Sequence, residues 1–345
     1  MGSVLYALNP DQRVVPFSPL RRPQLLSVVD WCQGSGEKRM WQVTGGAGSG
    51  KTRLLIEVVQ QLASKDFACG WVRHGQAVAA VEAAVARPGR VLLIVDDVDA
   101  SPRVQDDLAG MLTVLAQARA GRVKILVCGR EFSSWWARVR ASMDPADQAV
   151  LVPAGRTVLT TSLAGPADQL QQFHGAVRHY ARYFDRPAPG AALTVTATAI
   201  SVAELHAAAA ITAYRGLTGP VDLTTALRQL FTAEEAWWRT NAAAQQPAIT
   251  LPLPVLQCAI TAATLVGADS MDHAIRRLAH LPGLTTSSHE HRTELALWLR
   301  QLYAQRGGQW LDPHLPAYLA DRYAALCIGA HPGLAAALAT AALTT

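Results

Sequence analysis

An eight-residue stretch early in the chain has the residue types and spacing that bind phosphate. It fits the pattern G-x-x-x-x-G-K-[ST] and consists of Gly45, Gly46, Ala47, Gly48, Ser49, Gly50, Lys51 and Thr52. Its glycines allow a tight turn in which successive backbone N–H groups point at phosphate oxygens. Lys51 can reach the β- and γ-phosphates, and the Thr52 hydroxyl can bind Mg²⁺. The stretch therefore predicts a site for a nucleoside triphosphate.

The segments on either side of this loop test that interpretation against its alternative, a glycine-rich turn between two core elements. The apolar run 40–44 before it predicts a strand, and the amphipathic run 53–62 after it predicts a helix. A phosphate-binding loop needs this strand–loop–helix context, in which the start of the helix adds the positive end of its dipole. We therefore favour the nucleotide interpretation.

Two adjacent acids, Asp96 and Asp97, follow the apolar run 91–95, which is typical of a strand buried on both faces of a parallel sheet. In open parallel sheets, ligands bind beyond the carboxyl ends of the strands. We expect Asp96 to hold Mg²⁺ there, and Asp97 to orient an attacking water or accept its proton. A pair of helix-capping acids is the alternative. Asp99 could cap the next helix or share the site, which leaves the choice of base open.

Arg130 ends the next buried run, 123–128, and is predicted to lie at the same edge of the sheet as Asp96. A guanidinium there could contact the γ-phosphate and report its presence. The alternative is a surface arginine paired with Glu131. The predicted catalytic residues are therefore Lys51, Asp97 and Arg130, and the predicted metal ligands are Thr52 and Asp96.

The composition of the chain bears on its partners, its cellular compartment and the presence of membrane spans. The net charge is +5 with scattered basic residues, so a nucleic-acid partner is weakly supported and stays open. Five widely spaced cysteines favour reduced thiols in a cytoplasmic protein. The start of the chain has no signal-peptide pattern, and the apolar segment 191–214 favours buried helices over a membrane span. His289 and His291 are two residues apart, so they do not predict a metal site.

Strands and helices alternate over the first half of the chain, which predicts an α/β, doubly wound parallel sheet. Besides the strands already named, 68–72 and 158–163 complete five. From residue 167 onward the pattern is helix after helix, with Asp222 and Ser287 as candidate N-caps. The predicted helices are 167–183, 200–215, 222–242, 254–265, 270–280, 287–304 and 315–327, followed by a helical tail.

These patterns together resemble the actinobacterial members of the STAND class, signal-transduction ATPases with numerous domains that are related to NB-ARC- and NACHT-type ATPases. The motifs that carry the resemblance are 14–17 with Arg21, 45–52, 92–97 and 125–130, and softer matches extend it to about residue 328. The resemblance implies an α/β P-loop NTPase core followed by all-α helical and winged-helix domains. It also implies ATP/ADP and Mg²⁺ as cofactors, and a protein partner or homo-oligomer.

The expected domains follow from the resemblance and the composition. They are a leader (1–38), a P-loop nucleotide-binding domain (39–166), a helical domain (167–250), a winged-helix-like domain (251–330) and a truncated helical tail (331–345). Two features of the family are not matched by this sequence. His314 is out of register for the histidine that relatives place on the ADP phosphates, and a Gly-x-Pro adenine contact is only weakly matched by Gly216 to Pro220.

Three functions are compatible with the sequence. The first is an ATP-dependent molecular switch in signalling or defence with slow hydrolysis. The second is a DNA-associated AAA+-like ATPase that uses its winged helix, although Ser270 to His280 carries few basic residues. The third is a scaffold that binds nucleotide without turnover. No N-K-x-D motif for guanine is found, which favours ATP over GTP.

Overall fold

The computed structural model of the chain describes residues 3–36, 38–73, 75–99, 102–118, 121–131, 133–150, 152–161, 165–194, 200–303, 309–311 and 315–343. The chain divides into two compact units. We call the first the sheet unit, which comprises Val15–Ala164 and Ala199–Val202. We call the second the helical unit, which comprises Met1–Val14, Gly165–Thr198 and Ala203–Thr345.

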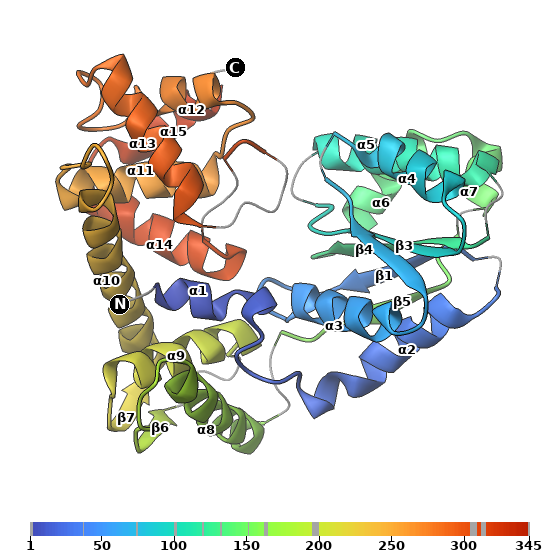
Figure 1. Ribbon diagram of the computed structural model, residues 1–345, viewed down its shortest axis with the longest axis horizontal. Helices are drawn as coiled ribbons and strands as arrows, with labels where there is room; N and C mark the ends of the chain where they lie inside the picture. The colour runs from blue at the N-terminus through green and yellow to red at the C-terminus, as the bar shows by residue number, and fades with distance from the viewer. Residues whose placement is uncertain are drawn as a thin grey trace. The chain divides into compact units, whose positions relative to one another are not determined.

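The sheet unit contains a five-stranded, wholly parallel sheet, as predicted, with the order β2-β3-β4-β1-β5 (Figure 1). The strands are β1 (Met40–Thr44), β2 (Phe67–Trp71), β3 (Arg90–Val95), β4 (Val123–Gly129) and β5 (Gly155–Val158). In this order β4 separates β1, which leads into the glycine-rich loop, from β3, which leads into the paired acids. All of these loops leave the sheet at its carboxyl edge.

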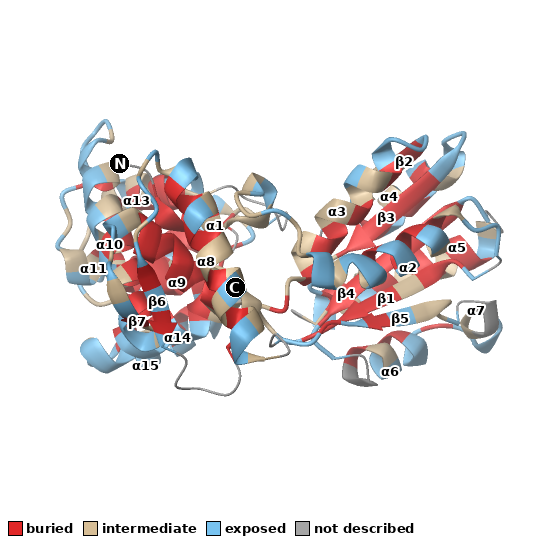
Figure 2. Cartoon of the chain, turned by 90° about the horizontal axis from the view of Figure 1, so that it is seen from below, coloured by how far each residue is buried: buried red, intermediate tan, exposed pale blue. Residues whose placement is uncertain are grey.

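Helices cover both faces of this sheet because its strands are apolar on both sides. Within β3, Leu92 and Ile94 belong to one buried cluster, whereas Leu93 and Val95 belong to the other. The first face is covered by α2 (Arg22–Gln33) and α3 (Lys51–Ala63). The second is covered by α4 (Ala77–Ala86), α5 (Pro102–Ala118) and α6 (Ser133–Ala141). Figure 2 shows the resulting buried strands between half-exposed helices.

The fifth strand lies earlier than predicted. It spans Gly155–Val158 and pairs Gly155 with Trp41, whereas the apolar run 158–163 suggested a later start. A Cβ atom at Gly155 would lie 2.6 Å from the Trp41 ring, so glycine permits this approach of the edge strand to β1. The prediction failed because an edge strand with one solvated side need not be apolar. Residues 162 and 163 lie outside the described residues.

The helical unit has the predicted succession of helices. They are α8 (Pro166–Tyr183), α9 (Val202–Arg215), α10 (Leu223–Ala243), α11 (Leu253–Leu265), α12 (Met271–Leu278), α13 (His289–Leu302), α14 (Ala317–Ala330) and α15 (Leu334–Leu343). The unit is not wholly α-helical, which corrects our expectation. The segments β6 (Ala191–Thr194) and β7 (Gly219–Asp222) pair as a two-stranded parallel sheet.

The two candidate N-caps had different outcomes. Asp222 caps α10 and accepts a hydrogen bond from the Thr225 amide at 2.8 Å, as predicted. The cap of α13 is Ser288 rather than Ser287, because it is the Ser288 hydroxyl that accepts from the amide three residues on, that of His291. Two adjacent serines look alike in sequence, and the start of the helix selects between them.

The beginning of the chain packs in the helical unit. There the short helix α1 (Val4–Leu8) lies beside α10, and the Leu5 amide donates to the Glu234 carboxylate at 2.8 Å (Figure 1).

The proposed division into five domains stays a prediction. Within the proposed winged-helix segment, Ala268 and Leu311 form an antiparallel bridge. No helix among the described residues is long and apolar enough to cross a membrane.

Candidate nucleotide site

The glycine-rich loop lies between β1 and α3, and its glycines have conformations that larger residues resist. Gly48 and Gly50 have φ angles of 76° and 90°, in the left-handed region that glycine adopts without strain. Gly45 is needed for a different reason, because a Cβ there would lie 2.5 Å from the Leu159 carbonyl oxygen. The loop is therefore held close to the chain that follows β5.

Lys51 is the first residue of α3, and its side chain returns over the loop. Its Nζ donates to the carbonyl oxygens of Gly45 and Gly46 at 2.7 and 3.1 Å. The residue is buried, so these carbonyls replace the water that the ammonium group loses. The cation is thereby held against the loop that is predicted to bind phosphate.

Thr52 and Asp96, the two predicted metal ligands, lie together. The Thr52 hydroxyl donates to Asp96 Oδ2 at 3.0 Å, although β1 and β3 are not neighbours in the sheet. A hydroxyl and a carboxylate are hard oxygen ligands of the kind that Mg²⁺ takes, together with waters and phosphate oxygens. The described residues offer no cluster of three or more His, Cys, Asp or Glu side chains for a metal held by protein alone. The donor set therefore fits a magnesium ion that arrives with a nucleotide.

Asp97 follows with a strained backbone and an altered acidity. Its φ of 49° is in the left-handed region, and its amide donates to Asp96 Oδ1 at 3.0 Å. Loss of hydration, followed by the nearby Asp96 carboxylate, raises the pKa of Asp97 to about 6, while Lys51 opposes this. The residue as a whole keeps part of its surface in contact with solvent at the edge of the sheet. A carboxyl group with these properties can exchange a proton near neutral pH.

Asp99, whose role the sequence left open, binds the backbone of Arg130. Its Oδ2 accepts from the Arg130 amide at 2.8 Å, and the Arg130 carbonyl in turn accepts from the Gly45 amide at 3.2 Å. A short chain of hydrogen bonds thus joins the acidic loop after β3 to the first residue of the glycine-rich loop. Sequence reasoning missed this connection because it depends on the position of β4 between β1 and β3.

The Arg130 side chain is exposed at the carboxyl end of β4, on the same edge as the acids. Its positive charge offsets part of the rise in the pKa of Asp97, so the two side chains interact electrostatically. Trp135, on α6 just beyond, is 1% exposed and belongs to the core of the second sheet face. His314 lies outside the described residues.

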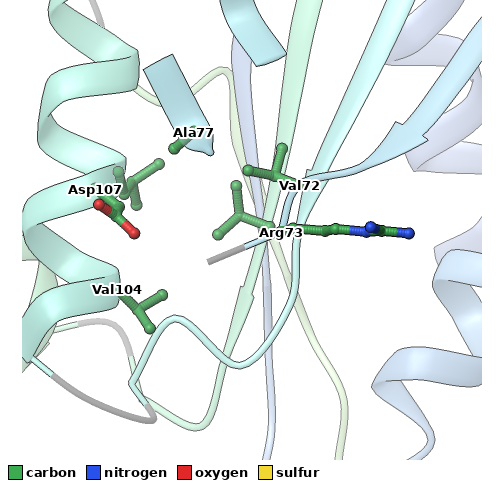
Figure 3. Close-up of a pocket in the computed structure, with 7 residues that line it drawn as sticks. Val72, Arg73, Ala77, Val104 and Asp107 are labelled. Atoms are coloured by element: carbon green, nitrogen blue, oxygen red, sulfur yellow. The ribbon is translucent and has the colours of Figure 1, made fainter. Parts of the chain in front are cut away.

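A small crevice beside the carboxyl end of β3 is not a nucleotide site (Figure 3). It measures about 10 Å³, room for one water molecule, between Val72, Val95 and helix α5. Asp107 faces it and accepts a hydrogen bond from the Gly75 amide at 2.7 Å, whereas the Arg73 side chain points away. The crevice therefore belongs to the packing of the loop before α4.

The solved structures to which the chain is similar are distant in sequence. No curated protein matches the chain. Among solved structures, the Orc1 protein of Aeropyrum pernix in complex with DNA is 14% identical, with a TM-score of 0.42 over 94% of this chain and 98% of that one. Cdc6p of Pyrobaculum aerophilum is 14% identical, with a TM-score of 0.39 over 93% and 89%. With TM-scores below 0.5, these likenesses support neither a fold nor a function for this chain.

A family model provides the sharper comparison. Residues 21–142 match the family described as Novel STAND NTPase 5. The matched segment contains the glycine-rich loop, the acids after β3 and the arginine after β4, and it forms most of the parallel sheet. Residues 21–142 are therefore similar to an NTPase family of the STAND class.

Proposed function

We propose that this chain is an ATP-binding molecular switch with slow Mg²⁺-dependent hydrolysis. ATP binding and hydrolysis would be coupled to a domain rearrangement or to self-assembly, in signalling or defence. The observation that carries the proposal is the 3.0 Å hydrogen bond between the Thr52 hydroxyl and Asp96 Oδ2. It joins the residues that would share one magnesium ion across the intervening strand.

The roles of the side chains follow from their positions. The amides of the loop and the start of α3 would bind the phosphates, and Lys51 would move from the loop carbonyls to the β- and γ-phosphate oxygens. Thr52 and Asp96 would hold Mg²⁺, which neutralises phosphate charge when it is bound. Asp97 would orient the attacking water and accept its proton, and Arg130 would contact the γ-phosphate.

Slow turnover is expected of such a site. An arginine supplied by a second protein can be worth roughly 10³–10⁵-fold in rate, and the chain would lack that contribution when it acts alone. A long-lived triphosphate state suits a switch, because its partner responds to the population of that state rather than to flux.

A DNA-associated ATPase receives less support from the helical unit. Arg277 is one of two arginines on α12, the helix that would enter a DNA groove. Its guanidinium donates to the carbonyls of Ala341 and Gly267 at 3.2 and 2.8 Å. These bonds fasten the ends of α11 and α15, so Arg277 is used inside the protein.

Nucleotide binding and assembly can be tested in one experiment. The purified chain is analysed by calorimetry and by size with ADP and with a slowly hydrolysed ATP analogue, each with Mg²⁺. We expect binding of both nucleotides and a change in hydrodynamic size or mass between them. Lys51→Ala should weaken binding ~100-fold or more, since charge-assisted hydrogen bonds contribute about 1.5–3 kcal/mol each. The exposed Lys65→Ala variant is the matched control. Undiminished affinity in Lys51→Ala would refute the site, and identical sizes in both nucleotide states would refute the switch.

A further inference from the structure

The helical unit contains a cavity of about 500 Å³ that is distinct from the nucleotide site. Its volume lies within the range of small-molecule sites, roughly 300–1,000 Å³. Four parts of the unit meet around it: α1, the end of α8 with the residues that follow, the end of α9, and the facing sides of α10 and α13. The lining residues are Ser3, Tyr6, Tyr183, Phe184, Arg186, Tyr214, Trp237, Leu302 and Tyr303.

A buried carboxylate fixes the inner wall of this cavity. Glu234 is 0% exposed, and its oxygens accept from the Ser3 hydroxyl at 3.0 and 3.1 Å and from the Tyr303 hydroxyl at 3.0 Å. Tyr303 also accepts from Trp238 Nε1 at 2.8 Å. Because a buried carboxylate is costly without such partners, these bonds hold Ser3 and Tyr303 in place. The wall is therefore formed before any ligand binds.

The lining is dominated by aromatic rings that form two groups. Trp237 and Tyr303 have centroids 5.8 Å apart, and Phe184 lies 5.3 Å from both Tyr183 and Tyr214. The rings within each group are tilted or edge-on rather than parallel, so ring faces and edges are both presented. Such walls favour a flat, apolar ligand over a flexible or strongly hydrated one.

Among the described residues that line the cavity, one is charged, and its charge is positive. The Arg186 guanidinium lies 5.2 Å from the centre of the Tyr214 ring and donates to the Tyr214 carbonyl oxygen through Nη1. No described residue that lines the cavity is acidic. Glu234 accepts hydrogen bonds from Ser3 and Tyr303 but is not part of the lining. An arginine held on an aromatic face keeps further N–H donors for a carboxylate or phosphate.

We propose that this cavity binds a planar aromatic molecule that carries an acidic group. The aromatic walls hold the flat part of the ligand, and Arg186 pairs with its negative charge. Binding at this place needs neither ATP nor its hydrolysis, so its test is independent of the proposed switch.

Three probes that share one ring system but differ in charge test the proposal on the full chain. They are 2-naphthoate, the neutral 2-naphthamide and the cationic 2-naphthyl-trimethylammonium, each titrated by calorimetry. We expect 2-naphthoate to bind about 10-fold more tightly than the amide, which corresponds to one charge-assisted contact. The cation should bind most weakly.

Two variants separate the charge from the rings. Arg186→Gln keeps a donor for the Tyr214 carbonyl and removes the charge, so it should abolish the preference for 2-naphthoate and leave 2-naphthamide binding unchanged. Trp237→Leu should weaken all three probes about 10-fold. The matched controls are Arg239→Gln, on the exposed side of α10, and Trp310→Leu, which does not line the cavity. Tighter binding of the cation, no measurable binding of any probe, or equal effects of the controls would overturn the proposal.

Discussion

Asp96 and Asp97 stand at an open edge of the sheet unit, whereas Glu234 is enclosed in the helical unit. The first pair is held by a few local contacts, such as the bond from the Asp97 amide to Asp96 at 3.0 Å. Glu234 is held by donors that lie more than two hundred positions away along the chain, in Ser3 and Leu5. Both settings raise a carboxyl pKa, chiefly because the group loses hydration.

The difference between these settings indicates what each acid is for. At the sheet edge, the acids retain access to solvent, so an incoming ion and phosphate can replace water around them. In the helical unit, every described contact of Glu234 is with a donor of the protein itself, so the carboxyl group fastens α1 to α10 and α13. Substitutions should therefore affect chemistry in the first setting and stability in the second.

The largest expected effect is on turnover at the sheet edge. Asp97→Asn removes the proton acceptor while it keeps the size of the side chain, and a positioned base contributes roughly 10²–10⁴-fold to a rate. We expect steady-state ATP hydrolysis to fall by at least ~100-fold with little change in nucleotide affinity. Asp30→Asn, at an exposed position of α2, is the control. A parent chain that shows no turnover would instead favour a non-hydrolysing scaffold.

The next effect is on the stability of the helical unit. Glu234→Ala leaves the Ser3, Leu5 and Tyr303 donors buried without their acceptor, which we expect to cost about 3 kcal/mol. Urea denaturation monitored by tryptophan fluorescence measures this loss, and limited proteolysis should show release of α1. The exposed Glu290→Ala variant should unfold like the parent. An unaltered midpoint in Glu234→Ala would contradict the role assigned to this carboxylate.

A smaller effect is expected where the acidic loop meets the glycine-rich loop. Asp99→Ala removes the acceptor of the Arg130 amide, and loss of a hydrogen bond of about 1.5 kcal/mol would lower turnover roughly 10-fold. Asp99→Asn retains a side-chain carbonyl oxygen and should retain most of the activity. If both variants lose the same activity, the negative charge of Asp99 matters rather than its hydrogen bond.

The smallest expected effect is a pH dependence of the stability that Glu234 contributes. Burial raises the pKa of Glu234 above its ordinary value of 4.5, so the folded state binds more protons than the unfolded state between the two values. Stability from this group is therefore greatest below pH 4.5 and falls as pH rises through the folded pKa. The free energy of unfolding of the parent, relative to that of Glu234→Gln, should follow this decline in urea titrations. A difference that does not vary with pH would show that the pKa is not raised.

The two units differ in which of their features could be predicted from the sequence. The loop 45–52 and the acids after 91–95 were recognisable because a phosphate site imposes residue types at short, fixed spacings. The helices of the second unit were predicted to within a few residues, since apolar periodicity and caps such as Asp222 act locally. The strands β6 and β7 were missed because each is short and gains its partner only after folding.

The sequence by itself determined the phosphate loop, the α/β class of the core and the series of helices, because residue types at short spacings and local apolar patterns record each of them. Only the tertiary structure decided that Asp99 binds the backbone of Arg130, that Ser3 reaches Glu234, and that aromatic residues from separate helices line one cavity. Those contacts join residues far apart in sequence. Their geometry is set by strand order and helix packing, which no short pattern of residues records.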